Sequence, residues 1–475
     1  MATGILARNT TYYTGALVLQ KILSFVYFWF ISNALMPGQL GQYVFALSFT
    51  TLFSILVDLG LSPVLTREAS KDKDQGNTYL QNVLGIKIPL AILTLVAAWL
   101  VITVTSKPDE VKLLIYLASF IMVLDSFSLS FWVIFRSRHT LVFESIATII
   151  VQIIIFSLGL FALQTTGQVR HLVMALLAAS VFNFCFAALL LKTKLKFRLK
   201  PRWNNQVVIH LLKIIPAFAL AGVFVKIYNA ADSVLLSFLA GDVAVGFFAV
   251  PAKVIFAFQQ IIPNAFAAVI FPAFSFYFAN SLVKLTETFH KAIRYLVILS
   301  FPLTAGLVVL ANDVVTTLWP SYVAVIPTFI IMALAIPFIF LAFPTGYLLN
   351  ACDQQRKNTL NRGIITTLAV VLNLILIPQF TYFGAGITFL ITNVLLLFLD
   401  TLWIGKVIKL QPLLLATILG KSLVATGLMI VVLVSLKASV HFLLLIPAGG
   451  IVYFVTLYLI KGFALTELKL LKRSS

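Results

Sequence analysis

Two stretches of the chain place polar side chains on one face of an otherwise apolar helix. In the first, Lys226, Asn229 and Ser233 are three and four residues apart, a spacing that puts them side by side on a helix. An ionised group inside a membrane-spanning helix is costly unless it meets a partner or a hydrated cavity. We therefore expect Lys226 to face a substrate-binding cavity. Asn229 either lines the same cavity or only joins two helices.

The second polar face follows a glycine turn. Lys253, Gln260 and Asn264 recur at spacings of seven and four residues, so they also share one helical face. Asp232 and Lys253 each lie roughly ten residues from the turn at Gly241, a depth of about 15 Å in two antiparallel helices. This predicts an ion pair between them or two walls of one cavity, and Asp232 is also a candidate for ion coupling or gating. For the two amides the alternative is a structural role.

Four further ionisable residues lie in apolar stretches. Lys21 is a third candidate for a substrate-binding cation, with a structural role as the alternative. Asp58 lies near the end of its stretch, where ion coupling, gating and a contact with Arg67 remain open. Asp125 and Asp400 are expected to be structural.

The elements that must position these residues are transmembrane helices. Of the 475 residues 61% are hydrophobic and 10% are charged, whereas a soluble chain has about a quarter charged residues. A spanning helix needs about 20 mostly apolar residues, so the chain is predicted to be an all-α polytopic membrane protein with about fourteen spans. The predicted spans are 11–35, 41–64, 83–104, 112–134, 143–163, 171–191, 208–239, 244–278, 292–311, 322–350, 361–378, 384–405, 412–435 and 440–461.

The basic residues alternate between the connections of these spans. The net charge is +19, and most of the 34 Lys and Arg fall in every second connection and at the two ends of the chain. Because cytoplasmic loops are enriched in Lys and Arg, both termini are predicted to be cytoplasmic. The stretch from Lys192 to Gln206 is the most basic connection; it is a topology signal and linker, and docking of anionic lipid headgroups is compatible with that role.

A weak internal repeat predicts two six-helix halves. The turn from Leu35 to Leu47 and the turn from Leu239 to Val250 each place a glycine before a Gly-x-aromatic start of the next helix. Equivalent helices six apart run in the same direction, and transporters often place a substrate site between such repeats. The predicted domains are a bundle at 1–191, a linker at 192–207, a bundle at 208–408 and two further helices with a basic tail at 409–475.

Several other function classes lack their signatures. No GxSxG, HExxH or P-loop pattern occurs, so we predict that the protein is not an enzyme. The five histidines form no cluster, the two cysteines have no metal spacing, and no metal or cofactor is expected. Nucleic-acid binding is rejected because no basic stripe interleaved with aromatics lies in a water-soluble stretch.

Ordered segments over most of the chain resemble one family. Val57-Asp-Leu-Gly-Leu-Ser-Pro-Val-Leu-Thr-Arg-Glu and the segment from Asp232 to Lys253 are similar to motifs of polysaccharide biosynthesis proteins, the oligosaccharide flippases. The later landmarks are Pro302, Leu318-Trp-Pro-Ser-Tyr, Leu372-Asn-Leu-Ile-Leu-Ile-Pro and Gly384-Ala-Gly386. These flippases belong to the multidrug, oligosaccharidyl-lipid and polysaccharide exporter superfamily.

The resemblance implies two six-helix bundles in a V around a central cavity with alternating access. It implies an oligosaccharide on a polyprenyl pyrophosphate as substrate, moved from the cytoplasmic to the outer leaflet of the cell membrane for polysaccharide synthesis. Basic cavity residues would attract the pyrophosphate. Proton or sodium coupling is expected, and a monomer suffices. Helices thirteen and fourteen add to the usual twelve, as in lipid II flippases.

Three alternatives remain open. A lipid II flippase differs only in its cargo. A multidrug antiporter would favour acids in the cavity, against which Lys21, Lys226 and Lys253 argue. A membrane glycosyltransferase or polymerase would need catalytic residues in a sizeable outer loop, and the outer connections offer only four acids.

Overall fold

The computed structural model describes residues 2–462, with the side chains of residues 2–11, 217, 218, 221 and 268 left out. Every regular element in this part of the chain is a helix. Up to residue 239 the helices are α1 (Ala2–Ala34), α2 (Pro37–Asp58), α3 (Leu61–Lys71), α4 (Gly76–Thr103), α5 (Asp109–Ser137), α6 (Val142–Thr165), α7 (Val169–Lys194) and α8 (Asn205–Leu239). The later helices are α9 (Asp242–Asn280), α10 (Leu282–Val309), α11 (Ala311–Leu318), η1 (Pro320–Val325), α12 (Ile326–Ala333), α13 (Ile336–Ala351), α14 (Gln355–Ile404), α15 (Pro412–Leu436) and α16 (Phe442–Leu459).

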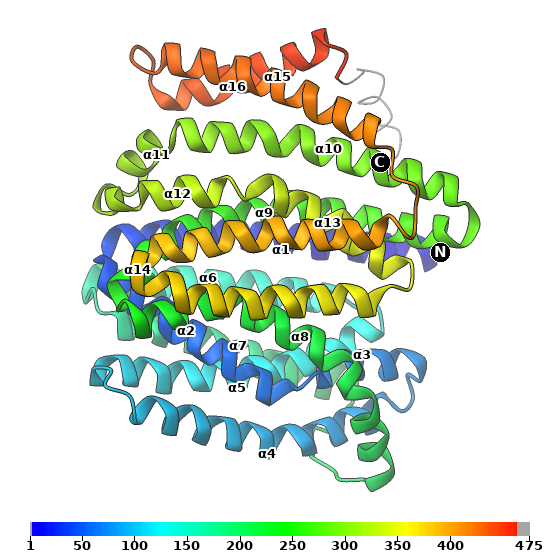
Figure 1. The fold of residues 1–475 in the computed structure, drawn as a ribbon. Coiled ribbons are helices and arrows are strands. Elements are labelled where there is room, and N and C mark those ends of the chain that lie inside the picture. Colours follow the sequence, from blue (N-terminus) through cyan, green and yellow to red (C-terminus); the bar gives the residue numbers. More distant parts are fainter. Residues whose placement is uncertain (1, 463–475) are drawn as a thin grey trace. The chain divides into compact units, whose positions relative to one another are not determined.

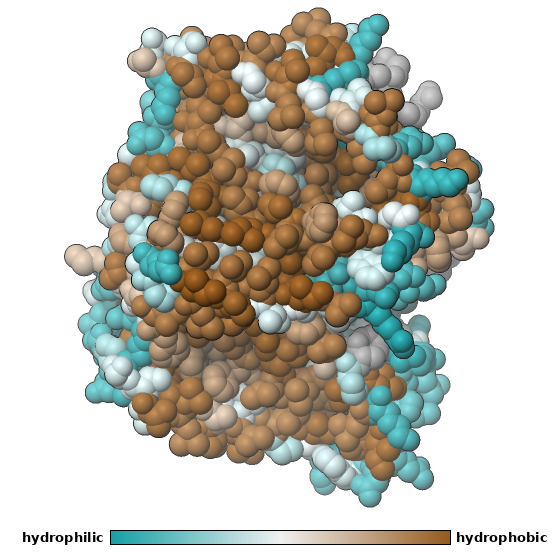
Figure 2. Space-filling model, in the orientation of Figure 1, coloured by the Kyte–Doolittle hydropathy of each residue, from teal (hydrophilic) through white to brown (hydrophobic). Residues whose placement is uncertain are grey.

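The number of spans agrees with the sequence. Thirteen helical segments of the described residues are long and apolar enough to cross a membrane. One of these, α14, is two helices joined at Thr381, where φ is +53° and the chain doubles back (Figure 1). Counting its two halves separately gives the fourteen predicted crossings. Apolar side chains cover the middle of the helices and hydrophilic ones gather toward their ends, as a polytopic membrane protein requires (Figure 2).

Contacts divide the chain after Ala249 into two compact units, here called unit 1 and unit 2. In unit 1, α5 packs against α2, α3, α4 and α7, and α8 packs along α2. A core around Phe131, Trp132 and Phe135 joins α5 to α3, α4 and α7. The contacts assign α8 to unit 1, whereas the sequence repeat places the start of the second bundle at residue 208. The predicted bundle boundary therefore stays a prediction.

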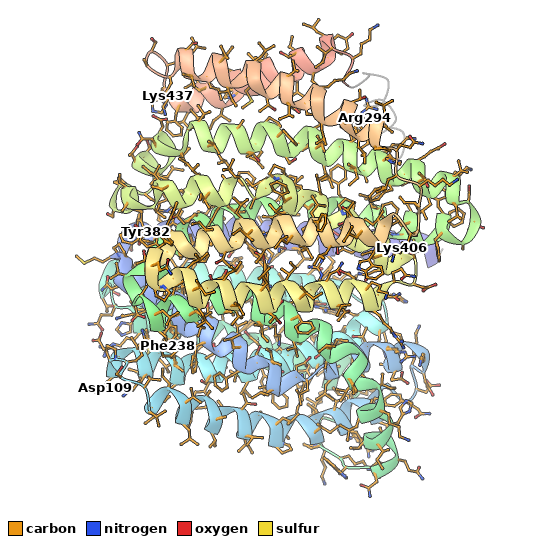
Figure 3. All side chains as sticks on the ribbon, viewed as in Figure 1. Asp109, Phe238, Arg294, Tyr382, Lys406 and Lys437 are labelled. Carbon is orange, nitrogen blue, oxygen red and sulfur yellow. The ribbon has the colours of Figure 1, made fainter. Side chains whose placement is uncertain are left out.

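Unit 2 is organised around α10, which packs against α13 and α15. The α15–α16 pair rests on α10 through Met429, Leu433 and Tyr453. Figure 3 labels Tyr382 and Lys437 at one end of the unit 2 helices, and Arg294 and Lys406 at the other. Charged groups thus mark both ends of the unit 2 spans.

Candidate functional site

A sharp corner at the end of α2 positions the first candidate acid. Asp58 is the last residue of α2, and the next two residues, Leu59 and Gly60, have φ values of +42° and +80°. The left-handed conformation at Gly60 suits glycine and starts α3 at an angle to α2. A Cβ atom on Gly60 would also lie 2.9 Å from the backbone nitrogen of Ala219, so this corner lets α8 approach closely.

Asp58 is held by a lysine from α4. The Nζ atom of Lys87 lies 2.7 Å from Asp58 Oδ1, and the Ser62 hydroxyl donates to the same carboxylate at 2.5 Å. Lys87 also donates to Ser126 O at 2.8 Å and to Ser130 Oγ at 2.7 Å, and its side chain is fully buried. The ammonium group has three protons, so this set of acceptors can satisfy it. We call Asp58, Ser62, Lys87, Ser126 and Ser130 the Asp58 cluster.

The depth of this cluster places a charged pair within spanning helices. Lys87 lies eleven residues after the first residue of α4, about 16 Å along a helix that is about 40 Å long. Breaking a buried pair by removing one partner is strongly unfavourable, because the other charge stays desolvated. The Asp58 cluster therefore fixes α2, α4 and α5 to one another.

A second cation approaches the cluster from α8. Lys226 Nζ donates to Ser54 Oγ at 2.9 Å and to the Ser54 carbonyl at 3.3 Å. Ser54 is one helical turn before Asp58, and the charges of Lys226 and Asp58 interact. Lys226 is half-buried whereas Lys87 is fully buried. Asp58 thus pairs with Lys87 while Lys226 bonds to Ser54 nearby, which leaves a surplus positive charge on the more accessible of the two lysines.

The start of α8 is attached to α3 as well. Glu68 is 5% exposed, and its carboxylate lies 2.9 Å from Lys71 Nζ and 3.2 Å from His210 Nε2. Burial opposes ionisation of Glu68, but the hydrogen bonds with Lys71 and His210 outweigh it and lower the pKa of this carboxyl. Hence α8 contacts the rest of unit 1 at its beginning as well as at Lys226.

At the opposite end of unit 1 the two repeat-related turns meet. Gly41 is the fifth residue of α2, and Gly246 is the fifth residue of α9. A Cβ atom on Gly41 would overlap the carbonyl oxygen of Asp242, and one on Gly246 would overlap the carbonyl oxygen of Pro37. The contact is reciprocal, since each glycine meets the first residue of the other helix. Only glycine permits the two helix starts to approach this closely.

An ion pair lies beside this glycine contact. Lys107 Nζ is 2.7 Å from Asp242 Oδ1 and also donates to Ser237 Oγ at 2.6 Å. The same ammonium group lies 4.9 Å from the centre of the Phe45 ring. Lys107 and Asp242 are only 12% and 13% exposed, so this pair is shielded from solvent. We call the Gly41–Gly246 contact and the Lys107–Asp242 pair the turn contact.

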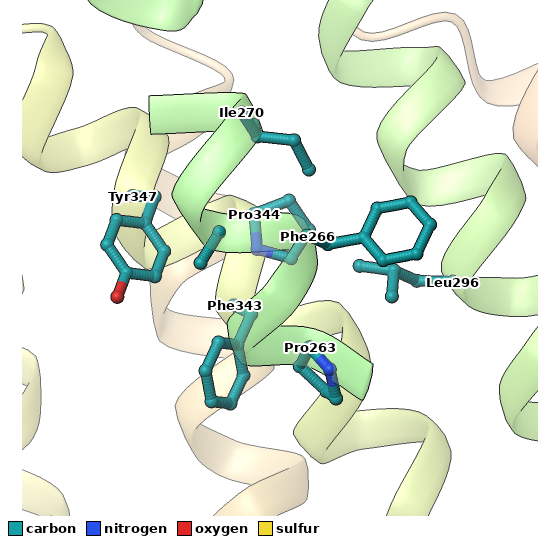
Figure 4. A pocket seen from close by; sticks show the side chains of 8 residues that line it. Pro263, Phe266, Ile270, Leu296, Phe343, Pro344 and Tyr347 are labelled. Atoms are coloured by element: carbon teal, nitrogen blue, oxygen red, sulfur yellow. The ribbon is translucent and has the colours of Figure 1, made fainter. Parts of the chain in front are cut away.

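In unit 2 the predicted polar face lies on α9. Asn264 Nδ2 donates to Gln260 Oε1 at 2.7 Å, which confirms that these two amides share a face. Apolar side chains of α9, α10 and α13 line a small hollow that is too narrow to hold a water molecule (Figure 4). Its lining offers no charged group, so it does not suit a diphosphate. The lining residues are Pro263, Phe266, Ala267, Ile270, Leu296, Phe343, Pro344 and Tyr347.

Comparison with models of protein families identifies the family to which this chain belongs. The model of polysaccharide biosynthesis proteins matches residues 6–278, more than half of the chain. The chain belongs to the polysaccharide biosynthesis protein family. The matched region contains the Asp58 cluster, Lys226 and the turn contact. A search of curated proteins found no match.

Solved structures of membrane flippases and transporters have the same fold as this polysaccharide biosynthesis protein. A lipid II flippase MurJ in an inward closed conformation has 14% identity and a TM-score of 0.79, and the match covers 94% of this chain and 98% of that one. An inward-facing multidrug resistance MATE transporter has 14% identity and a TM-score of 0.69, with 82% and 94% covered. The fold is therefore that of the multidrug, oligosaccharidyl-lipid and polysaccharide exporter superfamily.

The structure of this family member brings together some of the predicted site residues. Lys226 and Asp58 lie near each other in unit 1, an association that the sequence did not predict. Asn229 is exposed on α8, whereas Asp232 on α8 and Lys21 on α1 are half-buried. Asp232 belongs to unit 1 and Lys253 to unit 2, and their pairing stays a prediction.

Sequence reasoning missed Lys87 as a member of the site. It lies in the predicted span 83–104, but Arg67, which is nearer in sequence, was the contact considered for Asp58. A search for one buried cation for each buried acid would have suggested the pair. Asp400 in unit 2 differs from Asp58 in its hydrogen-bond partners, because its carboxylate accepts from two neutral side chains, Asn361 at 2.7 Å and Thr345 at 3.2 Å.

Proposed function

We propose that this protein is a flippase that moves a polyprenyl-pyrophosphate-linked oligosaccharide from the cytoplasmic to the outer leaflet by alternating access. The observation that carries the proposal is the surplus positive charge at Lys226, beside the pair that Asp58 forms with the buried Lys87. Membership of the polysaccharide biosynthesis family supports the class of cargo.

Lys226 is the group that first meets the pyrophosphate. Because Asp58 is already paired with Lys87 at 2.7 Å, Lys226 can bind an anion without leaving a carboxylate unpaired. Attraction between opposite charges is much stronger where water is scarce than in bulk solvent. Lys21 and Lys253 are the further cations of the proposed cavity, with Asn229, Asp232, Gln260 and Asn264 as its polar lining. The polyprenyl tail stays in the bilayer.

The turn contact closes the outer end of the pathway in this proposal. The end of unit 1 that carries the basic connection from Lys192 to Gln206 faces the cytoplasm, as the enrichment of Lys and Arg in cytoplasmic loops indicates. The contact between Gly41 and Gly246 then lies on the outer side. Release of the cargo requires this contact to open, and its return to the closed form resets the carrier.

Coupling to a proton or sodium gradient completes the proposed cycle, with Asp58 and Asp232 as the acids involved. A single protein in the cell membrane, with both termini cytoplasmic, is sufficient for this mechanism. A multidrug antiporter is the second candidate, because a MATE transporter shares the fold. It fits the site less well, since a cationic drug would be repelled by Lys226.

Replacing Lys226 by glutamine is expected to reduce transport at least tenfold while the protein still folds. The change removes the surplus charge but keeps a group able to donate to Ser54. Lys253→Gln is expected to have the same effect, and Lys213→Gln is the matched control because Lys213 is an exposed lysine of the same helix α8. The readout is restoration of surface polysaccharide in cells that lack the native protein. Full restoration by both Lys226→Gln and Lys253→Gln would remove these lysines from the mechanism.

The cargo itself can be identified by lipid analysis of cells lacking this protein. A polyprenyl-pyrophosphate-linked oligosaccharide is expected to accumulate on the inner face of the membrane, and expression of the native chain should reverse the accumulation. Accumulation of lipid II instead would assign the protein to the lipid II flippases. Unchanged polyprenyl lipids together with increased drug sensitivity would favour the antiporter.

A further inference from the structure

The connection between α7 and α8 has a regular alternating sequence and a defined path. Residues 195–204 read Leu-Lys-Phe-Arg-Leu-Lys-Pro-Arg-Trp-Asn and contain no helix. Basic residues occupy every second position over this stretch. We call these four residues the basic strip; they are Lys196, Arg198, Lys200 and Arg202.

Two of the three residues between the basic ones, Phe197 and Leu199, face the protein, whereas Pro201 is exposed. Phe197 is 6% exposed and belongs to the core that includes α4, α5 and α7, and Leu199 packs against the same core. All four side chains of the basic strip are exposed. In an extended segment successive side chains point to opposite sides, so Arg198, Lys200 and Arg202 are expected about 7 Å apart. Lys196 precedes them in a left-handed conformation with a φ of +55°.

Hydrogen bonds hold the backbone of this segment on the start of α4. The N–H groups of Arg198 and Asn204 donate to Asn77 Oδ1 at 3.2 Å and Asn82 Oδ1 at 2.7 Å. The N–H group of Arg202 donates to the Gln81 carbonyl at 3.1 Å. A connection that only signalled topology would need no such attachment. The four charges are therefore displayed in a fixed row.

The charges of the basic strip are not neutralised by the described part of the protein. None of the ion pairs among residues 2–462 involves a member of the strip. The segment from Lys192 to Asn204 contains no acidic residue. At its end Trp203 is 60% exposed, and tryptophan is enriched where a membrane meets water. The strip also lies directly after α7 and just before α8.

We propose that the basic strip binds the headgroups of anionic phospholipids in the adjacent leaflet. The row of unpaired cations provides the charge complementarity, and the exposed Trp203 provides an anchor at the level of the headgroups. Clusters of four or more Lys and Arg next to a spanning helix bind anionic lipid surfaces in this way. Because the backbone of the strip is hydrogen-bonded to α4, lipids bound to the strip would hold the starts of α4 and α8 at a fixed height in the membrane. This inference does not depend on the identity of the cargo.

The test compares two variants of the full chain that lose the same amount of charge. The first replaces the four residues of the basic strip by glutamine. The control replaces four exposed basic residues of unit 2 by glutamine, namely Lys284, Lys291, Arg356 and Lys409. Each purified protein is mixed with phosphatidylglycerol or phosphatidylcholine in detergent, and bound lipid is counted by native mass spectrometry. Size-exclusion chromatography verifies that both variants are folded.

The strip variant is expected to bind at least tenfold less phosphatidylglycerol than the native chain, with phosphatidylcholine unchanged. The control variant is expected to stay within about twofold of the native chain, and higher salt should weaken only the phosphatidylglycerol binding. Equal phosphatidylglycerol binding by both variants would overturn the proposal. The proposal would also be overturned if the strip variant bound phosphatidylglycerol normally but no longer bound a polyprenyl diphosphate, since the strip would then be a site for the cargo.

Discussion

Replacing Lys87 by methionine is expected to lower the free energy of unfolding by about 3–5 kcal/mol and to abolish transport. Methionine keeps most of the length of the side chain but leaves the half-buried carboxylate of Asp58 beside Ser62 without the cation that now lies 2.7 Å away. The loss of stability can be measured as a lower melting temperature in detergent. Transport can be measured by restoration of surface polysaccharide.

The control for this substitution is the same change at a more accessible pair. Lys437 lies 2.9 Å from Asp313, and the two side chains are 32% and 27% exposed. Lys437→Met is expected to cost less than about 1 kcal/mol, because an ion pair that water reaches is worth little. If Lys87→Met melted at the same temperature as Lys437→Met, the Asp58–Lys87 pair would not be the stabilising contact described here.

A double variant separates structure from transport. Asp58→Asn together with Lys87→Met removes both charges, so it is expected to recover most of the melting temperature that Lys87→Met loses. Transport is not expected to recover, because Asp58 is a coupling candidate in the proposed function. Native transport by the double variant would show that the pair is only structural.

Replacing Gly246 by alanine is expected to reduce transport at least tenfold with little loss of expression. The new Cβ atom would overlap the Pro37 carbonyl, so the starts of α2 and α9 would be forced apart. Overpacking of this kind costs about 1–3 kcal/mol, which is enough to shift a balance between open and closed forms. Gly41→Ala is expected to act alike, because the contact is reciprocal.

The matched control is Gly38→Ala in the same turn as Gly41. A Cβ atom there would lie 3.4 Å from Val243 Cγ2, an ordinary van der Waals distance, so transport should stay within about twofold of native. Opening can be followed with a cysteine at Leu40, which is fully buried, after Cys185 and Cys352 are replaced by serine. Gly246→Ala should make this thiol more reactive. Equal thiol reactivity in Gly246→Ala and Gly38→Ala would contradict the role of the turn contact.

The sequence predicted the spans and their number well, because apolar length and alternating basic connections are local properties of the chain. It also identified Lys226 as a site candidate, since a cation in an apolar helix is costly wherever that helix packs, and its role in binding substrate stays a prediction. The related glycines of the two turns were recognised as a repeat. Their direct contact was not, because a repeat does not specify which equivalent positions touch.

The partner of Asp58 could not be predicted from the sequence alone. Asp58 and Lys87 are on different helices, and only the packing of α2, α4 and α5 brings them within 2.7 Å. Arg67 was an alternative partner because it is close in sequence, but α3 starts at an angle after Gly60 and Arg67 lies 3.7 Å from Glu68. Similarly, the attachment of the basic strip to α4 could not be predicted, because its hydrogen bonds join residues that are far apart in the sequence.

Transfer of cargo by the purified protein in vesicles tests the central claim most directly. A polyprenyl-pyrophosphate-linked oligosaccharide with a labelled glycan is placed in both leaflets, and a glycan-cleaving enzyme is added outside. With the native chain nearly all of the label should become accessible, whereas Lys226→Gln should leave about half protected, as in vesicles without protein. Protection of half the label by the correctly folded native chain, under an imposed proton or sodium gradient, would contradict the proposed function.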